Sequence, residues 1–251
     1  HPTNPQLNSG RMECDFTATN EILVSYALKC PDGKKWTGNG AGEEDFGTDS
    51  NFKFFWLIDT ALGSAINDLV MFSNVGTTFY IHGNGLGTLD TFATTWWQWD
   101  VWNRVLIWVK ANAANPSGAA GNLFIQIINA NGYHQQLATP IVFATGQSPY
   151  TWNQGMFAAW ARNAALDSNR KVLMDDCYLA VGGNAAARVE LGNNAVYGSC
   201  TKLALCEVTS WADNRIQAVI HAGDLTLSAA TWMFITLPDN STQFSGQVVT
   251  P

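Results

Sequence analysis

Apolar and polar positions alternate most regularly between residues 102 and 110. The odd-numbered positions there are mostly aliphatic, whereas the even-numbered ones include Trp102, Arg104, Trp108 and Lys110. A period of two residues is typical of a β-strand that buries one face in a core. This stretch therefore predicts a central strand with one apolar face and one face on which indole rings lie beside cations.

Shorter patterns of the same kind predict strands along the rest of the chain, separated by turns rich in Gly, Asn and Pro. These strands are expected at 12–16, 21–28, 51–59, 68–73, 77–82, 123–129, 138–143, 157–161, 171–181, 188–191, 204–210, 215–221, 230–237 and 244–249. Residues 158–166 are the one stretch compatible with a short helix, and residues 1–11 are expected to form an extended arm. Many short strands joined by such turns predict an all-β sandwich.

The spacing of the predicted strands changes after the Gly-Gly-Asn turn at residues 182–184, beyond which short strands follow one another closely. We therefore expect two domains, a large β-sandwich at 1–186 and a small β module at 187–251. A chain of 251 residues is long enough to give the large domain an ample core.

The composition excludes some classes of partner. Charged residues make up only 13% of the chain, and 20 acids against 13 bases give a formal charge of -7. Binding to a phosphate backbone needs a basic stripe, so no nucleic-acid partner is expected. No apolar run approaches the length that crosses a bilayer, so membrane insertion is not expected either.

The five cysteines stand at positions 14, 30, 177, 200 and 206, and their odd number leaves one without a partner in the same chain. Cys14 with Cys30 and Cys200 with Cys206 are the disulfide candidates. Because no Cys-x-x-Cys occurs and the four histidines are scattered, the pattern does not resemble a zinc site. It favours an oxidising environment, and we expect a secreted protein at an extracellular surface.

The first residue is His1 rather than Met, which is expected if a secretory signal has been removed or a residue has been left from cloning. A free N-terminal histidine chelates copper when a second histidine completes the site. A copper-dependent polysaccharide oxygenase is therefore one alternative to weigh.

Several strands carry a resemblance to a known family. The stretches 52–57, 102–110, 122–127 and 174–179 resemble successive strands of concanavalin A-like lectin/glucanase jelly rolls. The stretches 187–192 and 209–216, the second reading Thr-Ser-Trp-Ala-Asp-Asn-Arg-Ile, look like the small immunoglobulin-like modules that follow such domains in bacterial and phage surface proteins. The resemblance implies a jelly-roll β-sandwich followed by a small C-terminal β-sandwich-like module.

The resemblance also implies a structural calcium ion, which related jelly rolls hold between an acid on the last strand and an acid on the first. The matching residues here are Asp175 or Asp176 together with Glu13 and Asp15. Adjacent residues of a regular strand point to opposite faces, so only one of the two neighbouring aspartates can face such a site. Two solvated carboxylates at a strand end are the alternative.

The catalytic motifs of this fold are missing. Retaining glucanases need two carboxylates at a fixed spacing on one strand, and no Glu-x-Asp-x-x-Glu occurs. Alginate-lyase jelly rolls use Gln-x-His with a Tyr and an Arg, whereas Gln217 and His221 are four residues apart and lie outside the main domain. We therefore assign no catalytic residues and expect the chain not to be an enzyme.

Three functions remain, and the first is our expectation. It is a non-catalytic extracellular subunit that self-associates into a filament, sheath or virion surface, because edge strands and free arms template pairing. The alternative is a lectin-like module that binds polysaccharide, and the third is a polysaccharide-degrading enzyme. Trp96, Trp97 and Trp99 are expected to contact the partner or the glycan, since indoles bury much area at little entropic cost. Trp102 and Trp108 are expected to be scaffold.

Overall fold

The computed structural model describes most of the chain. The described residues are 12–29, 51–61, 69–75, 78–83, 87–92, 96–98, 100–114, 121–141, 150–162, 173–228 and 230–247. The predicted N-terminal arm at 1–11 and the whole of the predicted loop at 30–50, including Cys30, lie outside this part.

Sixteen strands and one short 3-10 turn form three antiparallel sheets, which we call A, B and C. Sheet A has the order β1 (Met12–Thr19), β10 (Trp152–Arg162), β3 (Asn51–Ile58), β4 (Leu69–Val75), β5 (Thr78–Gly83), β6 (Gly87–Phe92). Sheet B has the order β11 (Leu173–Val181), β2 (Glu21–Lys29), β7 (Asn103–Lys110), β8 (Gly121–Asn129), β9 (Gly132–Ile141). Sheet C has the order β14 (Arg215–Val219), β13 (Leu203–Ala212), β12 (Arg188–Gly192), β15 (Trp232–Thr236), β16 (Thr242–Gln247), with η2 (Tyr197–Ser199) beside it. The protein is thus an all-β jelly-roll sandwich with a C-terminal sheet, as the sequence predicted.

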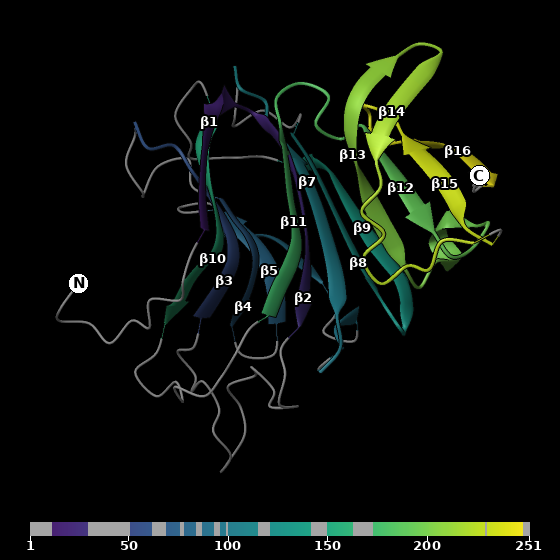
Figure 1. The fold of residues 1–251 in the computed structure, drawn as a ribbon. Coiled ribbons are helices and arrows are strands. Elements are labelled where there is room, and N and C mark those ends of the chain that lie inside the picture. The colour runs from purple at the N-terminus through teal and green to yellow at the C-terminus, as the bar shows by residue number, and fades with distance from the viewer. Residues whose placement is uncertain are drawn as a thin grey trace.

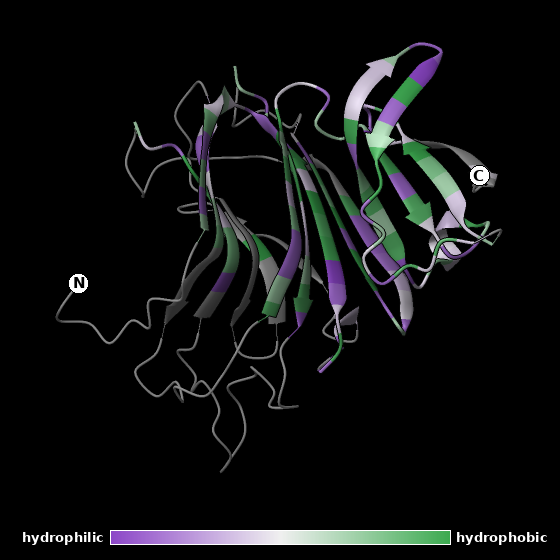
Figure 2. Ribbon diagram, viewed as in Figure 1, coloured by the Kyte–Doolittle hydropathy of each residue, from purple (hydrophilic) through white to green (hydrophobic). Residues whose placement is uncertain are grey.

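The three sheets lie side by side as layers, with sheet B in the middle (Figure 1). One face of sheet B packs against sheet A in the main core, to which Val24, Ile107 and Ile125 contribute from B and Phe55 and Phe157 from A. The edge strands β1 and β11 lie at the same side of this sandwich in Figure 1. In Figure 2 the strands of sheet B carry green segments interrupted by purple and white ones, as expected for strands that bury apolar side chains on part of their surface.

The second face of sheet B is covered by the C-terminal part of the chain. Leu106, Trp108 and Phe124 pack there against Ala185 and Ala186, which precede β12. A further cluster joins Ile128 of β8 to Leu203 and Phe234 of sheet C. Because the contacts of Ile128 with Leu203 and Phe234 cross residue 187, sheet C is held on the jelly roll by a shared apolar interface.

Strand β7 is the stretch with the clearest alternation, and its prediction is confirmed. Val105, Ile107 and Val109 are fully buried in the main core, while Arg104 and Trp108 face the side of sheet C. The indole of Trp108 donates a hydrogen bond to Glu21 on β2, and Lys110 forms an ion pair with the same carboxylate at 2.8 Å. The indole-and-cation face is therefore largely an interior surface.

Other sequence predictions need correction. The short helix that the sequence allowed at 158–166 is not formed as far as residue 162. The strand predicted at 157–161 is confirmed there, because these residues belong to β10 and pair with β3, Trp160 opposite Lys53. Strand β6 was not predicted, and β9 begins at Gly132, well before the predicted 138. Gly132 has a φ of 117°, which supports the tight Asn131-Gly132 turn. Within the described part, no helix is both long and apolar enough to cross a membrane.

Candidate functional site

The tryptophans predicted to contact a partner are less exposed than expected where the structure describes them. Trp97 is only 5% exposed and stacks on Phe54 in the main core, so it is not available for contact. Trp96 is half-buried, and its ring stacks on His134 at 5.5 Å between centroids. Trp99 lies outside the described residues. The exposed indole of this region is Trp102, at 40%, which corrects its assignment to the scaffold.

The four predicted calcium ligands do not come together. Glu13 and Asp15 alternate with Cys14, which packs toward the main core, so both acids face away from it on sheet A, where Asp15 accepts a hydrogen bond from Gln154. Asp175 and Asp176 line a cavity on the opposite side of the sandwich, toward sheet C. Among the described residues no group of three or more His, Cys, Asp or Glu is arranged to hold a metal. The calcium ion remains a prediction, without support from these four positions.

Neither predicted disulfide is seen among the described residues. Cys14, Cys200 and Cys206 are free thiols there, and Cys30, the predicted partner of Cys14, lies outside them. Cys200 packs with Leu203 and Phe234 between sheets B and C, whereas Cys206 packs with Val189 and Leu191 on the other face of sheet C. Cys200 and Cys206 therefore cannot pair, although they are close in sequence, because a disulfide requires the two Cβ atoms to approach within about 4 Å.

A cleft between sheet B and sheet C contains the most chemically varied side chains of the described structure. Its inner part, which we call the inner cavity, has a volume of about 420 Å³. The lining comes from β7, β11, β13 and the segment after β14, and consists of Arg104, Asp176, Cys177, Tyr178, Leu179, Leu205, Glu207 and His221. Residues from both sides of the domain boundary predicted from the sequence are therefore needed to form it.

Arg104 is the cation on the wall of the inner cavity. Its Nη1 donates a hydrogen bond of 2.8 Å to the carbonyl of Leu203, while its buried Nε has no partner among the described residues. Burial lowers the pKa of Arg104, although nearby groups, first among them Glu190, raise it. A guanidinium with an unused donor fits a planar carboxylate, which it can hold by two parallel hydrogen bonds.

Proton-transfer groups lie around this guanidinium. Burial, and to a lesser extent Glu207, raises the pKa of Tyr178, so its hydroxyl keeps its proton at neutral pH. His221 Nε2 lies 3.4 Å from Glu207 Oε2, and both side chains are well exposed. The neighbouring thiol is less suited to the chemistry, because burial raises the pKa of Cys177 to about 11 and keeps it protonated.

Strand β11, which carries Cys177 and Tyr178, is distorted where it lines the cleft. The pairing of β11 with β2 shifts between Asp175 and Tyr178, so an extra residue is accommodated there. Asp176 has a φ of 48°, and its backbone N–H is held by the side chain of Asp175 at 2.8 Å. A bulge of this kind turns side chains relative to a regular strand. Both Asp176 and Tyr178 face the inner cavity as a result.

The outer part of the cleft, which we call the outer cavity, has a volume of about 750 Å³. It shares Arg104 and Asp176 with the inner cavity, so the two are continuous. Trp102 stands in its wall. The charged residues around it are three cations and four acids, Lys29, Arg104, Lys202, Asp100, Asp175, Asp176 and Asp224. An exposed indole among hydrogen-bonding side chains is a common setting for a sugar ring.

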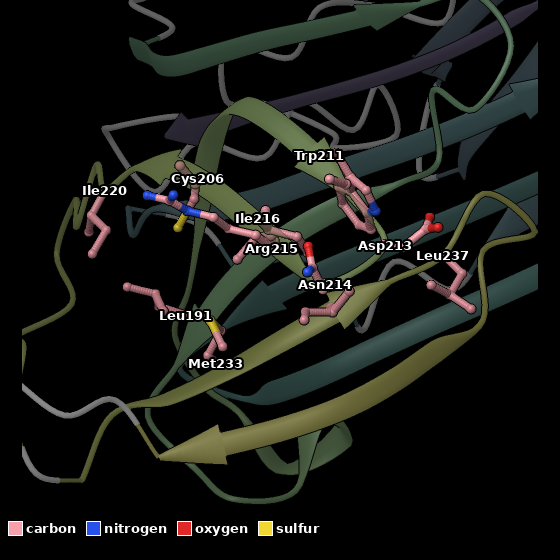
Figure 3. A pocket seen from close by; sticks show the side chains of 14 residues that line it. Leu191, Cys206, Trp211, Asp213, Asn214, Arg215, Ile216, Ile220, Met233 and Leu237 are labelled. Atoms are coloured by element: carbon pink, nitrogen blue, oxygen red, sulfur yellow. The ribbon is translucent and has the colours of Figure 1, made fainter.

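A separate groove of about 540 Å³ lies on the far face of sheet C, away from the cleft. Figure 3 shows the side chains of Leu191, Ile216 and Met233 pointing into it from three strands. It carries few groups capable of proton transfer, so the cleft is the better candidate for catalysis.

Comparisons with known proteins give similarity of structure only. No protein-family model matches the chain, and no curated protein matches its sequence. Among solved structures, alginate lyase Aly36B is similar at 14% identity with a TM-score of 0.44, over 67% of this chain and 72% of the other. Alginate lyase vAL-1 from Chlorella virus is similar at 13% identity with a TM-score of 0.43, over 68% and 84%.

A third similar structure is the marine PL-14 alginate lyase from Aplysia kurodai, at 10% identity with a TM-score of 0.40, over 65% of this chain and 70% of the other. All of these neighbours are polysaccharide-degrading enzymes. The expectation of a non-catalytic, self-assembling subunit is therefore corrected, and so is the expectation that the chain is not an enzyme. Because the TM-scores lie below 0.5, the chemistry proposed below rests on this chain's own residues.

Sequence reasoning considered Arg104 and His221 and did not connect them. They are far apart in the sequence and meet only because sheet C folds back onto sheet B. Tyr178 was not identified as a site residue, and Glu207 was set aside because it lies in the small second module; neither belongs to a local catalytic motif. The single signal for Arg104 was its position on the polar side of β7.

Proposed function

We propose that the cleft binds a polysaccharide that contains uronic acid and cleaves it by β-elimination in the inner cavity. The observation that carries this proposal is that Arg104, Tyr178 and His221 line one cavity. A cation for the carboxylate, a base and an acid are the groups that the reaction needs.

Each group has a defined role. Arg104, on the wall of the inner cavity, holds the uronate carboxylate with its guanidinium, which stabilises the negative charge that develops next to C5. His221, oriented by Glu207, removes the proton from C5. The electrons of the C5–H bond form a C4–C5 double bond, the C4–O bond breaks, and Tyr178 donates its proton to the departing oxygen. Tyr178 then regains a proton from solvent, and His221 releases to solvent the proton that it took from C5.

Tyr178 is the group that we assign as the acid. Its pKa, which burial raises further above neutrality, keeps the phenol protonated at neutral pH, so that it can donate. A secreted protein remains our expectation for its location.

The test is an assay for the unsaturated product, whose conjugated double bond absorbs in the ultraviolet. Alginate is the first substrate to try, since the similar solved structures are alginate lyases; polygalacturonate and hyaluronate follow, with an uncharged glucan as the control. We expect product from at least one polyuronate and its loss in His221→Ala. No product from any polyuronate, or full activity in His221→Ala, would contradict the proposal.

A second function is favoured by the outer cavity. Its charges nearly cancel, and Trp102 is 40% exposed in its wall, which suits a neutral or weakly charged sugar ring. Binding of a glycan that is lost in Trp102→Ala, without any product, would support a lectin-like module instead of an enzyme. Isothermal titration calorimetry with the same polysaccharides separates the two functions.

A further inference from the structure

The groove on the far face of sheet C has an apolar floor. Val189 and Leu191 come from β12, and Met233 and Ile235 come from β15. Ile216 and Ala218 of β14 form one wall, and Trp211 stands near one end (Figure 3). Its volume of about 540 Å³ lies within the range of pockets that hold specific ligands.

The groove exists because the two ends of sheet C do not meet. The first half of β13 pairs with β12, at Leu203 to Cys206, and the second half pairs with β14, at Glu207 to Ala212. The hairpin of β13 and β14 projects beyond the rest of the sheet in Figure 1. Sheet C therefore curls without closing, and the apolar side chains between β14 and β15 are left without a covering strand.

Strand β14 is also an edge strand, since β13 is its only neighbour in the sheet. No backbone hydrogen bond beyond that pairing is made by residues 215–219 with other described residues. An unpaired edge next to an apolar groove offers hydrogen bonds and side-chain contacts to the same ligand. A peptide strand uses both, whereas an alkyl chain uses only the apolar surface.

Two charges mark the direction in which such a ligand would lie. Arg215 and Asp213 line the groove, and within the described part of the chain neither forms an ion pair or a side-chain hydrogen bond. Figure 3 shows the Arg215 guanidinium extending toward Ile220 and the Asp213 carboxylate lying near Leu237, at the other end. A strand bound in the groove would therefore carry an acidic residue near Arg215 and a basic residue near Asp213.

We propose that this groove binds an extended peptide strand of a partner protein, with aliphatic residues at alternate positions and opposite charges at its two ends. The strand adds to the free edge of β14, and its aliphatic side chains cover Ile216, Met233 and Ile235. The site is independent of the cleft, which lies on the other side of sheet C.

The test uses the full chain and a fluorescent synthetic peptide in which Val and Thr alternate between an N-terminal Glu and a C-terminal Lys. Fluorescence polarisation measures its dissociation constant. Met233→Trp fills the groove and should weaken binding by about tenfold or more. Leu137→Glu, at a 56% exposed side chain on β9, is the matched control and should leave binding unchanged. Circular dichroism of each variant checks that it is folded.

Two further comparisons identify the occupant. A peptide with N-methylated alternate amides should bind weakly, because it cannot pair with an edge. Arg215→Glu should weaken the binding of the original peptide several-fold and favour one whose end charges are exchanged. The proposal is overturned by the absence of saturable peptide binding, by equal binding of the methylated peptide, by an unchanged affinity in Met233→Trp, or by saturable binding of dodecanoate but not peptide.

Discussion

Arg188 and Glu190 form a buried ion pair where sheet C meets sheet B, with 2.8 Å between Nε and Oε2 and exposed fractions of 2% and 0%. The hydroxyl of Tyr197 donates to the same carboxylate oxygen at 2.6 Å, and Asn240 accepts from Arg188. Burial lowers the pKa of Arg188, but Glu190 and Tyr197 more than compensate and raise it overall. The Arg188 guanidinium is thus held charged in the interior.

The first prediction concerns the removal of one member of this pair. Arg188→Met leaves the Glu190 carboxylate buried without its cation, and we expect the free energy of unfolding to fall by about 3 to 5 kcal/mol. Urea denaturation followed by circular dichroism measures it. The double replacement Arg188→Met with Glu190→Leu should recover much of this loss, because the apolar pair has no charge to desolvate.

The matched control is Lys202→Met. Lys202 and Asp224 are 3.3 Å apart, but their side chains are 45% and 70% exposed. An exposed pair contributes about 1 kcal/mol or less. Equal losses from the buried and the exposed replacements would contradict the argument that burial makes the Arg188 charge necessary.

The second prediction concerns the close packing at Gly192, the last residue of β12. A Cβ atom there would lie 2.6 Å from Cys200 Sγ, 2.8 Å from Leu203 Cδ2 and 2.9 Å from Phe234 Cε2. All three neighbours are buried, so they cannot move aside freely. Gly192→Ala should therefore lower the free energy of unfolding by about 1 to 3 kcal/mol.

Gly183→Ala provides the comparison in a thermal melt, because nothing lies within 4 Å of the position that its Cβ would occupy. The midpoint of Gly183→Ala should stay close to that of the unmodified chain. A midpoint for Gly192→Ala that is equally unchanged would mean that sheet C packs more loosely around β12 than described.

The sequence predicted the fold far better than the site. Regular alternation identified β7, and its faces were assigned correctly because period-two burial depends only on local order. The strand predicted at 157–161 is confirmed, and the short helix that the sequence also allowed at 158–166 is not formed up to residue 162, because pairing of β10 with β3 overrides the helix preference of the alanines there. Trp97 was expected at the surface, but the fold stacks it on Phe54. Local sequence patterns do not reveal whether a segment distant in the sequence will bury an aromatic side chain.

The cleft depends on contacts of a longer range still. Arg104 and Tyr178 lie on β7 and β11 of sheet B, and His221 joins them only after sheet C docks on that sheet. Their convergence is decided by apolar contacts such as Ile128 with Leu203, which carry no chemical motif. Catalytic motifs are short patterns in the sequence, so they do not reveal a site whose residues are divided between two sheets.

The third prediction follows from the thiol of Cys206, which is 1% exposed under the groove of sheet C. Burial, helped by Glu190, raises its pKa from 9.0 to about 11. Between these two values the unfolded chain has released the proton and the folded chain retains it. The stabilisation is therefore complete below about pH 9 and is lost as the pH rises toward 11, by at most about 2 to 3 kcal/mol.

Cys206→Ala removes this contribution. We expect its free energy of unfolding to decline less steeply between pH 9 and 11 than that of the unmodified chain. Val208→Ala, in the same apolar cluster, controls for the lost volume and should retain the original slope. Parallel slopes for all three proteins would contradict the assignment of the proton to Cys206.

The fourth prediction separates the roles of Tyr178 and Arg104 and rests on the proposed lyase activity. Tyr178→Phe keeps the ring and removes the proton donor, so kcat should fall by about 100-fold or more with KM little changed. Arg104→Lys keeps the charge but lacks the planar fork, so it should weaken carboxylate binding and raise KM as well. Initial rates over a range of polysaccharide concentrations, with circular dichroism of each variant, measure both effects. If Tyr178→Phe retained full kcat while Arg104→Lys lost it, another group would be the acid, and His221, after taking the C5 proton, would have to pass it to the departing oxygen.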